Sequence, residues 1–494
     1  MTIDDHKTSY WNSAAGPREV LQLALPLFLS MSSMTIQVFI DRMFLTWYSK
    51  EAIAASIPAV CVLWVFVGPL NGIVMFANTF VAQYHGAGRN DRIGPAVGQA
   101  LLVAFIAGVA LCGLWPLAGF IFRAAGHAAA VIELEAAYFQ TLLVSAAPML
   151  VMNAASCFFG GLGRTWIVLL FNVVATAVNI ILDYAFIFGR WGAPEMGIAG
   201  AGWATAAAYF VAAIVAIALM WSADERGEFG IRRSRGAASF LRPDADLLWR
   251  LLKFGGPAGL MMLVEVFAFT WFVLLVGRLG TTALAATNVA FNINMFAFGP
   301  MIGMGTATQI LVGQRLGENR ADLAARATWS ALWLSLAYTF VLGAGYVLCP
   351  QLFLAPIRWY GDPDDYAALS ELIIGLLRFV ALYSLFDTSA LIFGSALRGA
   401  GDTRFVMAVT FALAFGVIVV PCYFAADLLQ GRLFAAWWLV TGYVMALGAA
   451  LFARFQAGTW RSMRVIESVA VQVESAALCE LPSAVEPVSA EPRP

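Results

Sequence analysis

Two short stretches share one glycine-proline pattern: GPLNG at residues 68–72 and GPMIG at residues 299–303, which lie 231 residues apart in an apolar chain. The same shift superimposes other residues of the two halves: Pro26 on Pro257, Ala54-Ala55 on Ala285-Ala286, Gln83 on Gln314 and Gly86 on Gly317. A shift of 238 residues aligns a later set: Gly161, Gly163 and Thr165 with Gly399, Gly401 and Thr403. Chance similarity between apolar segments does not keep glycine-proline pairs in register, so the chain contains an internal repeat.

The composition around the repeat is that of a membrane protein. Of the 494 residues, 61% are apolar and 12% are charged, and the mean hydropathy is +0.80. Soluble proteins average about 45–50% apolar and about 25% charged residues. The difference excludes an ordinary soluble enzyme and a disordered protein, and the net charge of -1 gives no basic surface for nucleic acid.

A transmembrane helix needs about 20 apolar residues, and we identify twelve such segments. We therefore predict an all-α integral membrane protein with twelve transmembrane helices in two pseudo-symmetric six-helix bundles. Six is an even number, so both halves begin on the same side and the repeat is parallel. A cavity between two such halves suits alternating access, and the alternative is a duplicated bundle without transport.

Charge and composition place the boundaries of the predicted regions. Most of the 29 Lys and Arg residues fall at the span ends on one side, so both termini are expected in the cytoplasm. The predicted regions are a cytoplasmic N-terminal segment at 1–17, an N-lobe with spans one to six at 18–221, a cytoplasmic linker at 222–247, a C-lobe with spans seven to twelve at 248–456, and a disordered cytoplasmic tail at 457–494.

Four acidic residues fall well inside predicted spans: Asp41, Asp183, Glu265 and Asp387. A charge at the bilayer centre costs about 2.5–3.5 kcal/mol on insertion scales, so an acid there usually serves a function. Glu265 and Asp387 have no basic residue within one helical turn. Such groups can exchange a proton, a metal cation or a cationic substrate, and the alternative is an acid held in the packing by hydrogen bonds.

Polar neighbours accompany these acids at helical spacing. Asn172, Thr176, Asn179 and Asp183 form one stripe on a single face of span five. Oxygen ligands of this kind suit a hard cation such as sodium. Tyr383 shares a face with Asp387, and Asn288 shares one with Asn292. The asparagines can also serve as hydrogen bonds between helices.

Proline and phenylalanine residues suggest further roles. Pro26 and Pro257 open spans one and seven, where they are expected to kink the helix; a moving hinge is the alternative to a fixed kink. Phe269, with Phe267 and Phe272, could face a cation in the cavity or contact lipid.

Motifs of enzymes are not found. The sequence has no HExxH, P-loop or GxSxG motif, and its six cysteines lack paired spacing. We expect no enzyme activity, no cofactor and no bound metal beyond a possible sodium ion.

These segments resemble the multidrug and toxic compound extrusion (MATE) family over residues 18–456. In the first half the similar strings are FIDRMFLTWYSKEAIAAS (39–56), GGLGRT (160–165), NIILDYAFIFG (179–189) and GIAGAGWAT (197–205). In the second half they are GRLGTTALAATNVAFNI (277–293), VGQRLGEN (312–319) and ALRGAGDT (396–403).

The resemblance, closest to the bacterial NorM-like branch, implies two lobes in an outward-facing V. It implies an N-lobe cation site at Asp41, Asn179, Asp183 and Thr205, and a C-lobe site at Glu265, Tyr383 and Asp387. Tyr138 would match a cavity tyrosine, and Pro26 the kinked proline of the first span. Asn288, Asn292 and Phe269 are the remaining cavity residues that we predict.

The predicted function is a secondary antiporter of a bacterial inner membrane, which exports amphipathic organic cations, including drugs, in exchange for sodium ions or protons. Membrane lipid is the other expected partner, and a monomer is sufficient. One alternative is a flippase for a lipid-linked precursor in the same superfamily, whose cavity would be more cationic. Another is a membrane-embedded enzyme, for which the residues offer no constellation.

Overall fold

The computed structural model describes residues 10–125, 129–232, 239–358, 363–424 and 432–467. Within these ranges the regular structure is helical and contains no β-strand, which confirms the predicted fold class. The predicted N-terminal segment before residue 10 and the predicted tail after residue 467 lie outside the described residues.

The first half forms the N-lobe, residues 17–223. Its helices are α1 (Pro17–Tyr48), α2 (Lys50–Met75), α3 (Ala77–Gly86), α4 (Ile93–Leu111), α5 (Ala118–Ala124), α6 (Ala129–Gly161), α7 (Thr165–Phe188) and α8 (Ile198–Ala223). The second half forms the C-lobe, residues 245–456. Its helices are α9 (Ala245–Arg278), α10 (Thr281–Gly317), α11 (Ala321–Leu348), α12 (Pro350–Arg358), α13 (Pro363–Ala400), α14 (Thr403–Leu413), α15 (Val420–Phe424) and α16 (Leu433–Gln456), with a π-helical turn at Ala414–Val419.

Local signals in the sequence set several of these helix ends. The Ser49 side chain accepts a hydrogen bond from Ala52 N and begins α2, as an N-cap should. Asp244 begins α9 in the same way, accepting from the backbone of Asp246 and Leu247. Gly189 ends α7 with a φ of 63°, a left-handed conformation that glycine adopts at low cost.

The lengths and apolarity of the helices fit a membrane. Among the described residues eleven helices are long and apolar enough to span it, and α10 adds a twelfth as a bent pair, 281–295 and 298–317, inclined by 47°. Large apolar side chains are exposed on the outer surface, for example Phe39, Phe210 and Phe340, each at least 60% exposed. In water such a surface would be unfavourable, whereas lipid covers it at no cost, so the protein is a multi-pass membrane protein.

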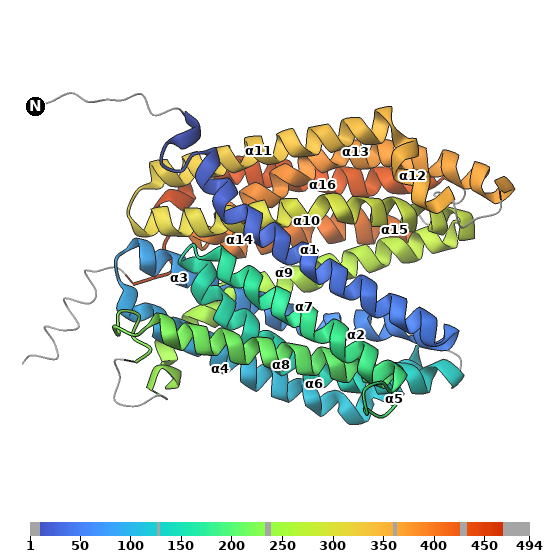
Figure 1. Ribbon diagram of the computed structural model, residues 1–494. Coiled ribbons are helices and arrows are strands. Elements are labelled where there is room, and N and C mark those ends of the chain that lie inside the picture. Colours follow the sequence, from blue (N-terminus) through green and yellow to red (C-terminus); the bar gives the residue numbers. More distant parts are fainter. Residues whose placement is uncertain (1–9, 126–128, 233–238, 359–362, 425–431, 468–494) are drawn as a thin grey trace, which may run out of the picture.

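The two lobes join at one end of the molecule, which we call the closed end. Figure 1 shows the first turns of α1, the short helix α3 and the end of α16 together at this end, on the left of the view. One apolar core runs from the N-lobe into the closed-end half of the C-lobe, through residues such as Ile310 and Leu397. A second core, around Phe272 and Trp437, lies within the C-lobe alone. Packing therefore holds the lobes together mainly at the closed end.

Residues 457–467, which the sequence assigned to a disordered tail, instead pack against this closed end. A short 3-10 helix at Thr459–Ser462 places Trp460 in a fully buried position, where its ring stacks on Phe455. Val465 is also buried and donates its backbone N–H to the Gln83 side chain at 2.8 Å. The high Ala, Glu, Pro and Ser content that suggested disorder belongs mostly to the residues after this segment.

Candidate functional site

The N-lobe holds a small acidic pocket of about 110 Å³. Asp41 on α1 lines it and accepts a hydrogen bond of 3.3 Å from the Tyr138 hydroxyl on α6. Asp183 on α7 is fully buried beside it and is an electrostatic neighbour of Asp41. Neither Asp183 carboxyl oxygen has a hydrogen-bond partner among the described residues. Buried oxygens without partners are costly, so the two Asp183 oxygens are free to accept hydrogen bonds or to contact a cation.

Of the polar stripe on α7, Asn179 lines this pocket, whereas Asn172 donates to the carbonyl of Val168 in its own helix at 2.9 Å. Asn179 is fully buried and donates to the Thr205 hydroxyl on α8 at 3.2 Å, while its own carbonyl oxygen lacks a donor among the described residues. Thr176 bonds to α1, accepting from the Ser33 hydroxyl at 2.9 Å. The structure thus brings together Asp41, Tyr138, Asn179, Asp183 and Thr205.

A larger cavity of about 540 Å³ lies between the lobes. Its acidic lining residues are Glu265 on α9 and Asp387 on α13, and Phe269 lines it as predicted. The N-lobe contributes α2 and α3 residues that include Asn71, Met75 and Asn78. This volume falls in the range of small-molecule pockets, about 300–1,000 Å³, and the walls are mostly apolar.

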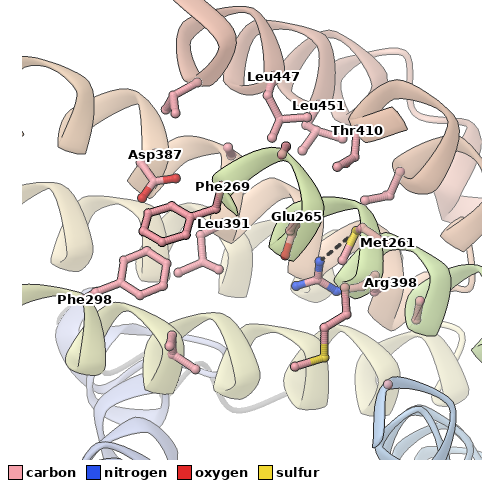
Figure 2. Close-up of a pocket in the computed structure, with 18 of the residues that line it drawn as sticks. Met261, Glu265, Phe269, Phe298, Asp387, Leu391, Arg398, Thr410, Leu447 and Leu451 are labelled. Carbon is pink, nitrogen blue, oxygen red and sulfur yellow. Dashed lines mark hydrogen bonds between the residues drawn. The ribbon is translucent and has the colours of Figure 1, made fainter. Parts of the chain in front are cut away.

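Figure 2 shows a positively charged side chain in this cavity that the sequence did not predict there. The Arg398 guanidinium, near the end of α13, points toward Glu265. Its place near the end of a span in the sequence indicates a topological role, and it lies more than one helical turn from Glu265 and Asp387 in the sequence. The spacing offered a signal: Asp387 and Arg398 are eleven residues apart, which places them on the same face of a helix.

Three predicted residues lie elsewhere. Asn288 and Asn292 are exposed on α10 and are not among the residues that line either cavity, so the structure does not support their place in the substrate cavity. Tyr383 is 4% exposed and packs near Trp437, one turn from Asp387 but outside the cavity lining. A shared helix face is set by spacing, whereas the neighbour that the face meets is set by tertiary packing.

The two prolines both lie inside continuous helices. Pro26 is buried in α1, and the carbonyl of Pro26 accepts a hydrogen bond of 2.9 Å from the Ser30 hydroxyl. Pro257 lies in α9, which runs unbroken from Ala245 to Arg278. A hinge at either proline stays a prediction.

Residues of the internal repeat close the interface between the lobes. Gln83 of the N-lobe donates to the carbonyl of Gly399 at 2.9 Å, and its repeat equivalent Gln314 donates to the carbonyl of Gly161 at 2.8 Å. The glycines at Gly86 and Gly317 let the backbones meet, because a Cβ on either would lie within 2.3 Å of a carbonyl oxygen across the interface. We call these paired contacts the seam.

Ionic contacts surround the seam. Glu19 on α1 pairs with Arg315 on α10. Glu467 pairs with Arg89 at 3.0 Å and with Arg92 and Arg250 at 3.4 Å, so it links both lobes. Burial works to raise the pKa of the Glu467 carboxyl, but hydrogen bonds and the neighbouring arginines outweigh that effect and hold the pKa below its ordinary value.

Two helical lobes with a cavity between them and buried carboxyls in each define a membrane transporter. The MatE family model matches residues 26–185 and 257–424, two segments that begin at the repeated prolines 231 residues apart. The chain therefore belongs to the MatE family of multidrug transporters, and it is not an enzyme.

Solved structures share the fold over nearly the whole chain. One is described as the outward-facing conformation of a multidrug resistance MATE family transporter of the MOP superfamily; it is 19% identical, with a TM-score of 0.81, covering 92% of this chain and 99% of that one. Another is a MOP superfamily transporter from Pyrococcus furiosus described as having a binding pocket of reversed polarity. It is 19% identical, with a TM-score of 0.79, covering 92% of this chain and 98% of that one.

Proposed function

We propose that this protein is a secondary antiporter that exports lipophilic organic cations in exchange for sodium ions or protons. The observation that carries the proposal is the pair of unequal cavities. The N-lobe pocket of about 110 Å³ is too small for a drug-sized molecule but has room for an ion with a few waters. The interlobe cavity of about 540 Å³ has room for an organic cation, with carboxyls and aromatic rings to bind it.

In this proposal the two sites bind different ligands. The coupling ion or proton occupies the carboxyls of Asp41 and Asp183, and the organic cation binds near Glu265 and Asp387. Coupling arises because each ligand prefers a different state of the two lobes, so that loading the ion weakens the binding of the drug. Reciprocal linkage then requires that the drug weakens the binding of the ion to the same degree.

We place the protein in a bacterial inner membrane with the closed end and both termini in the cytoplasm. Arginines are frequent around the closed end, for example Arg89, Arg250 and Arg315, as the positive-inside rule expects of a cytoplasmic face. Each chain carries both lobes of the cavity, so a monomer is sufficient for transport.

The test is ethidium transport by purified protein in liposomes, with a sodium gradient and a proton gradient imposed separately. We expect transport under one of the two gradients, and its loss in Glu265→Gln and Asp387→Asn. Glu371→Gln, at an exposed acid on the same helix as Asp387, is the matched control and should transport normally. Normal efflux in both cavity variants, or no transport under either gradient, would contradict the proposal; flipping of a lipid-linked precursor would then be measured.

A further inference from the structure

Arg398 stands apart from the chemistry of a site for simple cations. Its guanidinium lines the interlobe cavity, bonds to the Ser395 hydroxyl at 2.9 Å and touches the Met261 sulfur at 4.0 Å. Among the described residues no carboxylate oxygen lies within 4.0 Å of it. A guanidinium offers five N–H donors, so most of the donors of Arg398 remain for a ligand.

Asp387 and Arg398 lie at different places along the cavity. Figure 2 shows Asp387 beside Phe269 and Phe298, and Arg398 some turns further along α13, with Leu391 between them. Neutral amide side chains, Asn71, Asn78 and Gln309, complete the polar lining that α2, α3 and α10 contribute. The cavity therefore offers an acidic region at Asp387 and, across apolar surface, a second region where Arg398 lies beside Glu265.

We propose that Arg398 is a specificity-determining residue that binds the carboxylate of a zwitterionic amphiphile, while the cationic nitrogen of the same molecule faces Asp387. The proposal rests on the proposed function, because it requires that organic molecules occupy this cavity. Arginine binds a carboxylate through two parallel N–H···O bonds, which a lysine cannot reproduce. The apolar surface between the two charges receives the rings that connect them.

A rival explanation is that Arg398 only balances the charge of Glu265, toward which it points. The two explanations predict opposite changes in ligand affinity when Arg398 is removed. If Arg398 is a counter-charge, its removal makes the cavity more negative and strengthens the binding of every cation, with or without a carboxylate. If it binds the carboxylate, its removal weakens the binding of zwitterions alone.

The experiment compares rhodamine B, which carries a carboxylate and a cationic xanthene ring system, with its ethyl ester, which lacks the carboxylate. Binding to the purified full-length protein is measured by fluorescence anisotropy. In Arg398→Gln we expect the affinity for rhodamine B to fall about tenfold or more, the loss of a charge-assisted hydrogen-bond pair. Affinity for the ester should stay the same or rise.

Arg404→Gln, at an exposed arginine that does not line the cavity, is the matched control and should bind both dyes like the wild type. A parallel change in both dyes in Arg398→Gln would overturn the proposal. Should that variant fail to fold, Arg398→Lys decides: a fall in the ratio of rhodamine B to ester affinity supports the proposal, and an unchanged ratio overturns it. If the wild-type protein binds the ester but not rhodamine B, this inference alone is overturned. If the wild-type protein binds neither dye, the proposed function is overturned as well.

Discussion

The two lobes descend from one repeat, yet their cavities differ in chemistry. Under the two repeat shifts, each acid that lines one cavity corresponds to an apolar residue that lines the other: Asp41 to Phe272, Glu265 to Met34, and Asp387 to Met149. The duplicated backbone thus keeps the same positions turned toward a cavity. What changed between the halves is which of these positions carries a charge, and with it the ligand that each cavity suits.

The largest effect is expected from removing the charge of one cavity at a time and measuring transport and dye binding separately. Asp183→Asn should reduce gradient-driven ethidium transport by about tenfold to a hundredfold, because the ion loses its carboxyl. Dye binding to the interlobe cavity, measured by anisotropy, should be nearly unchanged. Asp387→Asn should instead weaken dye binding directly.

The control for this pair is Glu51→Gln, an exposed acid at the start of α2, which should behave as wild type in both assays. If Asp183→Asn and Asp387→Asn lost dye binding equally, the assignment of the ion to the N-lobe pocket and of the organic cation to the interlobe cavity would be wrong.

The seam should behave in the opposite way to the cavities, because there the repeat kept its residues. Gly86→Ala and Gly317→Ala would place a Cβ 1.9 and 2.3 Å from the carbonyl oxygens of Gln314 and Gln83. Each should cost about 1–3 kcal/mol of stability, as overpacking does. Melting in detergent measures this, with Gly256→Ala, whose Cβ would meet nothing within 4 Å, as control. A clear loss in one variant and none in the other would show that the seam is not symmetric.

Neither repeat shift places an acidic residue of the first half on Glu467. The stability that Glu467 contributes therefore comes from a part of the closed end that the repeat does not duplicate. Its pKa in the folded protein is lowered, so its stabilising contribution is complete above the unfolded pKa, roughly 4.3, and is lost as the pH falls through the folded value. Glu467→Gln should therefore be less stable than wild type at neutral pH, by about 1–2 kcal/mol. The difference in melting temperature between the two proteins should vanish once the pH lies below the pKa of Glu467 in the folded protein. A difference that persists there would assign the effect to packing rather than to charge.

The smallest effect should come from Tyr138→Phe in the N-lobe pocket. The variant removes one hydrogen bond of 3.3 Å to Asp41 and keeps the ring. Ion-driven transport should change by about twofold, since a single neutral donor contributes about 1 kcal/mol or less at this length. A loss as large as that of Asp183→Asn would give Tyr138 a direct part in ion binding.

Much of the fold could be predicted, because apolar length and a register of Gly-Pro pairs are local properties of the sequence. The short helices α5 and α12 and the break between α2 and α3 could not, since they depend on how neighbouring spans pack. The buried acids were predictable because a charge inside a span is costly wherever it points.

The partners of those acids were predictable only in part. Asn179 and Thr205 meet because helices α7 and α8 pack together, which the family resemblance implied and spacing alone did not. Arg398 lies close to the end of its span, so its position in the sequence suggested topology, while its direction into the cavity is a property of the folded lobes.

The docked segment at residues 457–467 has a practical consequence for handling the protein. A truncation after Gln456, where the last span ends, would remove Trp460, Val465 and Glu467 and leave the arginines at the seam without their shared carboxylate. A fluorescent reporter or purification tag fused at that point would compete for the same surface. Fusions placed beyond residue 467 leave these contacts intact. A protein that ends at Gln456 lacks them and should not be treated as equivalent to the full chain.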